Sequence, residues 1–236
     1  MSFDPAAVRK HNLALLKKHG FSVAPGLPLS DQSRLRPADE IAGRLAALNA
    51  LFIYVTAPES FCSESTLRAH IDTNNLAQHL TDEEREGLAL PRKEASESLD
   101  ASIGWKTENA YTLAWILGSP SAPAAPPFDG QLLAPPAIIP DAPKPGSDYA
   151  AWRATLTPRP YPEVAALEDL FYCCHNAVRS AQLEFMQNGR QHPKRYTTIP
   201  AGFDPLTNGG VIHERRHALT WSINPDDSWD ETDLST

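Results

Sequence analysis

Residues 162–185, PEVAALEDLFYCCHNAVRSAQLEF, hold the most regular apolar pattern in this chain, and they decide its fold. Pro162 suits the first turn of a helix and Gly189 suits the position after its end. Between them, apolar side chains recur three or four positions apart, which is the spacing of one helix face. They are Val164, Leu167, Phe171, Cys174, Val178, Ala181 and Phe185. We therefore expect a long helix at the centre of the core.

Similar spacing and end signals predict further helices on both sides of this stretch. Thr81 and Glu84 form a capping-box pattern, which predicts the start of a helix. Gly118 followed by Pro120 predicts the end of the helix that precedes Gly118. Helices are expected over 5–19, 37–55, 65–76, from 81, over 103–117, over 147–152 and over 210–223. Strand signals are weak, and residues 196–199 are the best candidate. The fold class is mainly α, a multi-helix bundle.

A proline-dense segment over residues 120–146 interrupts the helical pattern. We expect a single helical domain over 1–236, with N-terminal helices in 1–119, this segment as a long connector, and C-terminal helices with an acidic tail in 147–236. Leu132, Leu133, Ile138 and Ile139 are apolar enough to hold the connector against the domain surface.

Composition narrows the classes of function. The net charge of −8 disfavours nucleic acid as a partner, and no apolar run is long enough for a membrane span. The first residues do not resemble a secretory signal, and three cysteines without metal-site spacing suit a reducing cytoplasm. Neither a Walker A loop nor a GxGxxG loop is present. We expect a cytoplasmic protein without a cofactor.

The segment 213–217 reads HERRH, a literal HExxH motif on an expected helix. This spacing places His213 and His217 on one face, where both can bind zinc while Glu214 acts as general base. Arg215 and Arg216 between them disfavour a dication, and no further histidine follows. The competing interpretation is a packed helix whose charged residues form ion pairs with neighbouring helices.

Four polar residues of the central stretch, Glu168, Tyr172, His175 and Arg179, follow one another at spacings of four, three and four. They form a stripe that can be a binding or acid/base surface, together with Glu108, Glu214 and Arg215 from other helices. The alternative is a buried network that fixes how two helices pack. Cys174 and His175 point about 100° apart on a helix, which excludes them as a nucleophile and base pair.

The order and spacing of five blocks resemble the bacterial family called domain of unknown function 4272. The blocks are VRKHNLALLKKHGF, LRPADEIAGRLAALNAL, IGWKTENAYTLAWILG, LEDLFYCCHNAVRSA and VIHERRHALTWSI, the last followed by WDETDLST. The resemblance implies a helical bacterial cytosolic domain. It emphasises Trp105, Glu108, Trp115, His175, Arg179, Glu214, Arg215, Ala218, Leu219 and Trp221. At position 213 the family pattern commonly has tyrosine or another residue, which weakens the zinc hypothesis.

Three hypotheses of function remain. The first is a non-enzymatic protein-binding domain, such as an immunity or accessory protein that holds a basic bacterial toxin. The second is a zinc-dependent hydrolase that uses residues 213–217. The third is small-molecule binding at the polar stripe of the central helix, which predicts that the stripe residues converge on a pocket open to solvent.

Overall fold

The computed structural model describes residues 3–31, 34–133, 142–187 and 196–236. Within these ranges the chain forms eight α-helices and one 3₁₀ helix, and no strand. The helices are α1 (Pro5–Lys18), α2 (Ala38–Thr56), α3 (Glu64–Thr73), η1 (Leu76–His79), α4 (Asp82–Ala89), α5 (Arg92–Ile116), α6 (Tyr149–Ala154), α7 (Tyr161–Gln187) and α8 (Thr207–Ile223). The expectation of a mainly α fold is confirmed.

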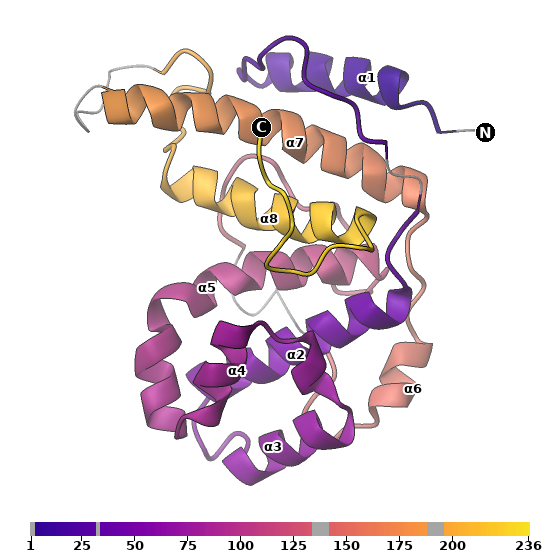
Figure 1. Ribbon diagram of the computed structural model, residues 1–236, viewed down its shortest axis with the longest axis vertical. Helices are drawn as coiled ribbons and strands as arrows, with labels where there is room; N and C mark the ends of the chain where they lie inside the picture. Colours follow the sequence, from indigo (N-terminus) through magenta and orange to yellow (C-terminus); the bar gives the residue numbers. More distant parts are fainter. Residues whose placement is uncertain (1–2, 32–33, 134–141, 188–195) are drawn as a thin grey trace.

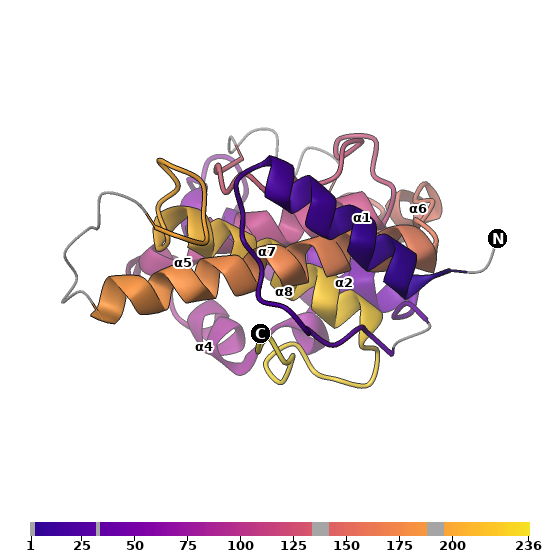
Figure 2. The same cartoon turned by 90° about the horizontal axis from the view of Figure 1, so that it is seen from above.

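The long helices form a stack in which α1 packs on α7, α7 on α8, α8 on α5, and α5 on α2 (Figure 1). Helix α3 lies beyond α2 at the far end of the stack, and the short helices α4 and η1 pack against α5 and α2 (Figure 1). Seen along the stack, α1 lies across α7 (Figure 2). None of the helices in the described ranges combines the length and apolarity needed to cross a bilayer.

Two apolar clusters hold the stack together. The larger one joins α1, α7, α8, the first half of α2 and the second half of α5, with Phe171 and Leu219 fully buried. The smaller one joins the end of α2 to α3, α4 and the first half of α5, around Leu51, Leu67 and Leu99. Because α2 and α5 contribute to both clusters, they connect the two ends of the molecule.

Helix α8 lies between α7 and α5, and two glycines in its first turn permit the close approach. A Cβ atom at Gly209 would stand 2.7 Å from Val178 Cγ1 on α7. One at Gly210 would stand 2.9 Å from Trp105 Cζ3 on α5. Contacts on both sides leave α8 without a polar face, so its charged residues are placed inside the protein.

The sequence predictions differ from the structure in a few local details. Residues 196–199 form no strand, and the burial of Tyr196 and Ile199, three positions apart, does not follow the alternating pattern of one. Helix α3 is capped by Ser63 instead of Ser65, and α8 begins at Thr207 instead of Gly210. In the connector, Leu132 is 58% exposed. Leu133 packs on the larger cluster, and residues 138 and 139 lie outside the described ranges.

Candidate functional site

Glu108 on α5 and Arg215 on α8 form an ion pair that is fully closed to solvent. Arg215 Nη2 lies 2.7 Å from Glu108 Oε2. Arg215 also donates to the carbonyls of Pro127 and Gln131, and Glu108 Oε1 accepts from the Leu133 amide at 3.0 Å. These two predicted site residues therefore bind the backbone of the connector and stand apart from the polar stripe of α7.

Three of the stripe residues surround Arg216, a residue that our candidate set omitted. Arg216 Nη1 lies 2.7 Å from His175 Nδ1, and its guanidinium carbon lies 4.8 Å from the centre of the Tyr172 ring. Glu168 Oε1 is 4.0 Å from Arg216 Nε, and it accepts from Thr220 Oγ1 at 3.0 Å. Arg216 is 3% exposed, and its Nε has no hydrogen-bond partner among the described residues.

The charge of Arg216 is only partly balanced. Burial raises the pKa of Glu168 against the opposing effect of Arg216, and burial lowers the pKa of Arg216 itself. Burial and then the charge of Arg216 lower the pKa of His175 to about 2, so this imidazole is neutral. Because arginine can only donate, His175 Nδ1 is the acceptor and Nε2 carries the proton. The cluster thus holds a buried cation with a distant counter-charge.

The acidic segment that follows α8, residues 224–236, turns back across α8 toward α7 (Figure 1). Side chains bind it mainly through its backbone. Arg36, His217 and Arg216 donate to five of its carbonyls, those of Asn224, Asp227, Trp229, Leu234 and Ser235. The Trp229 ring also packs on the His217 ring, with centroids 4.3 Å apart. The side of α8 that carries Arg216 and His217 therefore binds a polypeptide segment through its backbone.

Two cavities flank this segment in the cleft between α7 and α8. The first, of about 720 Å³, is lined by His175, Arg179 and His213 with Leu183 and Leu206, and no carboxylate side chain is among the described residues of its lining. Burial and then the charges of Arg216 and Arg179 lower the pKa of His213. This cavity, which we call the basic pocket, is rich in hydrogen-bond donors.

The second cavity, of about 330 Å³, lies on the other side of Arg216. Its lining includes Arg9, Glu168, Tyr172, Asp227 and Asp233, so that it carries charges of both signs. Arg9 is already paired with Asp169 at 2.8 Å. The predicted stripe therefore divides: Glu168 and Tyr172 line this mixed cavity, whereas His175 and Arg179 line the basic pocket.

The three residues that define the HExxH motif face different neighbours. His213 contacts the His175 ring, with centroids 5.3 Å apart, and His217 Nε2 donates to the Trp229 carbonyl at 2.9 Å. Glu214 lies beside Asn109 of α5, and burial raises its pKa. In the part of the chain that the structure describes, no three histidine, cysteine or acidic residues are grouped so that they could hold a metal ion.

The cysteines of α7 are buried within the core. Burial raises the pKa of the Cys173 thiol to about 12, and it raises that of Cys174 as well. Both thiols are therefore protonated at neutral pH, where the thiolate is the nucleophile. Cys174 behaves as a small apolar group, as its place in the apolar stripe predicts.

Arg216 and Arg36, whose guanidinium groups donate to carbonyls of the acidic segment, were missed as site residues. One signal for Arg216 was available: the sequence of α8 has no continuous polar face, and such a helix is buried on several sides. Charged residues on it must then have buried partners.

No curated protein and no solved structure matches this chain. A family model described as "Domain of unknown function (DUF4272)" matches residues 9–232 of 236. Since the match spans nearly the whole sequence, the chain belongs to the DUF4272 family.

Proposed function

We propose that this protein is a non-enzymatic binding domain whose basic pocket receives an acidic, extended segment of a partner protein. The observation that carries the proposal is the way α8 holds the chain's own acidic segment. Arg216 and His217 donate to backbone carbonyls, which any extended peptide offers. The same helix continues into the basic pocket, which this segment borders through Leu234, Ser235 and Thr236.

The charge of the pocket sets the expected charge of the partner. Arg179 supplies the positive charge among the described residues of its lining, because the lowered pKa values of His175 and His213 keep both imidazoles neutral; no carboxylate side chain is among these residues, although the whole chain carries −8. Local potential governs which surface docks and how fast it does so. An acidic partner segment fits this pocket better than the basic toxin surface that the net charge favours.

Apolar residues at the rim supply the other half of the recognition. Leu183 on α7 and Leu206 before α8 are 53% and 48% exposed, and both line the pocket. Exposed apolar side chains beside charged ones are typical of protein-binding surfaces. The partner segment therefore combines acidic residues with leucine-like anchors.

The states of the acid/base groups support binding over catalysis. The pair Glu108–Arg215 is closed and bound to the connector, His217 is hydrogen bonded, and the Cys173 thiol is protonated. A cytoplasmic immunity or accessory protein that holds a bacterial toxin through such an acidic segment is one role that fits this proposal.

The test is a titration of the protein against a short fluorescent peptide of alternating leucine and aspartate, followed by anisotropy. A peptide with asparagine in place of aspartate serves as the uncharged control. We expect the acidic peptide to bind at least about tenfold more tightly, since charge complementarity provides much of the recognition. Equal affinity for the two peptides would overturn the proposal.

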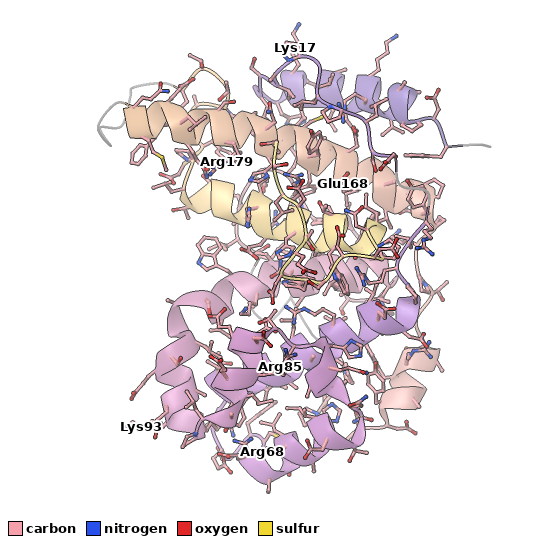
Figure 3. All side chains as sticks on the ribbon, viewed as in Figure 1. Lys17, Arg68, Arg85, Lys93, Glu168 and Arg179 are labelled. Atoms are coloured by element: carbon pink, nitrogen blue, oxygen red, sulfur yellow. The ribbon has the colours of Figure 1, made fainter. Side chains whose placement is uncertain are left out.

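A matched pair of variants places the binding. Arg179→Gln removes a charge from the pocket, whereas Lys93→Gln removes one from an 89% exposed side chain of α5 at the opposite end of the molecule (Figure 3). We expect Arg179→Gln to weaken the acidic peptide several-fold and Lys93→Gln to leave it unchanged. Equal losses in both variants would show non-specific attraction and contradict the assigned site.

A further inference from the structure

A third cavity, distinct from the two in the cleft of α7 and α8, lies where three loops meet. Its walls come from the turn after α1, from the connector, and from the loop that leads into α8. The volume of about 470 Å³ lies within the range of small-molecule sites. Nothing in the proposed function depends on this cavity.

Three phenylalanine rings and one imidazole are part of its lining, and neighbouring rings stand at steep angles to one another. Phe21 and Phe203 meet at 81° with centroids 5.4 Å apart. The ring of His19 meets that of Phe128 at 81° and 5.1 Å, and Phe21 is tilted by 59° from Phe128. The four rings of the lining are thus in contact with one another at interplanar angles of 59° to 81°.

The cavity carries a single carboxylate, that of Asp129, among the residues described as lining it. Asp129 Oδ1 accepts from the Gln131 amide at 2.9 Å, which fixes the side chain at the rim and leaves Oδ2 free of that bond. The nearby guanidinium of Arg215 is neutralised by Glu108 on the core side of the connector. The cavity therefore combines aromatic side chains with one carboxylate, and no lysine or arginine is among its described lining residues.

The walls are fixed before any ligand arrives. Arg215 Nη2 donates to the Gln131 carbonyl at 2.6 Å, and Asn208 Nδ2 donates to the Gly130 carbonyl at 2.8 Å. Asn208 Oδ1 in turn accepts from the Asp204 amide at 2.7 Å, so that one side chain joins the connector to the loop before α8. A preorganised cavity loses little entropy on binding.

We infer that this cavity, the aromatic cage of Phe21, Phe128, Phe203 and His19 with Asp129, binds a small quaternary ammonium ligand. The π faces of aromatic rings attract a cation that cannot donate hydrogen bonds, and methyl groups on nitrogen fill the space between rings. The carboxylate balances the charge. A neutral apolar molecule of the same shape would make the same van der Waals contacts, but it would lack both the cation–π attraction and the attraction to the carboxylate.

The experiment titrates the protein with choline chloride and, separately, with 3,3-dimethyl-1-butanol, in which a carbon replaces the charged nitrogen. Binding is followed by ligand-observed NMR at constant ionic strength. We expect choline to bind at least about tenfold more tightly than the alcohol, which is the effect of a desolvated cation–π site. Equal affinity, or no choline binding, would overturn the inference.

Variants assign the effect to the cage. Asp129→Asn changes an exposed residue and keeps its shape, so that the fold is preserved, and we expect it to weaken choline several-fold without affecting the alcohol. Phe128→Leu keeps an apolar wall and removes its π face. Phe61→Leu, at a 66% exposed ring far along the chain, is the matched control. Choline affinity that is unchanged in Asp129→Asn and Phe128→Leu would place binding elsewhere and refute the assignment.

Discussion

Glu84 of α4 offers a quantitative test of the electrostatics inside this fold. Its side chain is fully buried between two cations, with Arg44 Nη2 3.0 Å from Oε1 and Lys106 Nζ 2.8 Å from the same oxygen. Burial acts to raise the pKa of Glu84, but the charges and hydrogen bonds of Arg44 and Lys106 outweigh it, and the pKa falls to about 2.

The sign and size of the effect follow from linkage. A folded pKa below the unfolded value of 4.5 gives stability that is present above pH 4.5 and is lost as pH falls through 2. The difference corresponds to about 3 kcal/mol of unfolding free energy, of which about 2 kcal/mol is lost by pH 3. Glu84→Gln also leaves the buried Arg44 without its counter-charge, at a cost of about 3 to 5 kcal/mol near neutral pH.

The assay is urea unfolding of the wild type and of Glu84→Gln at pH 6 and at pH 3. We expect the difference in unfolding free energy between the two proteins to shrink by about 2 kcal/mol at the lower pH. Glu97→Gln, which removes a 69% exposed carboxylate from α5, should differ from the wild type equally at both pH values. A gap between wild type and Glu84→Gln that does not change with pH would refute the account of this buried cluster.

Further predictions concern the backbone and the thiols. Gly118 has a φ of +70°, and an added Cβ would overlap the carbonyl oxygen of Thr157, so Gly118→Ala should cost about 2 kcal/mol or more in thermal unfolding. Gly26→Ala, at a φ of +79° with open space around it, should cost clearly less; equal losses would remove the steric part of this argument. Cys173 and Cys174 should resist an aromatic disulfide reagent in the native protein and react only in denaturant, while the remaining, half-buried cysteine reacts first. Rapid native reaction of all three thiols would contradict the buried placement.

The parts of the fold that local sequence determines could be predicted from it. The apolar spacing of α7 identified its core face, because one helix face needs only a period near 3.6. The capping box of Thr81 and Glu84 forms as expected, and Gly118 adopts the positive φ of a helix end. Each of these features involves residues within a few positions of one another.

The candidate site depended on contacts between distant residues, and sequence patterns do not encode those. Glu108 and Arg215 are 107 positions apart, and their role became visible only with the connector backbone between α5 and α8. The inner face of α1 shows the same limit: Arg9 and Asn12 are buried against Asp169 of α7, while the apolar Leu13 is 38% exposed. Polarity alone predicts that Leu13 is buried and that Arg9 and Asn12 are exposed. The hydrogen bonds of Arg9 and Asn12 to Asp169 explain why the observed burial is the opposite.

The connector is held by its carbonyl oxygens at Pro127, Gly130 and Gln131, and every amino acid carries that group. Its anchorage is therefore indifferent to most side chains along the segment. Asp129, an exposed residue between the anchored positions, can be exchanged for other residues while the path of the chain is kept. Ligand preference at this loop can thus diverge between relatives, or be diversified in a library, on a scaffold whose core stays the same.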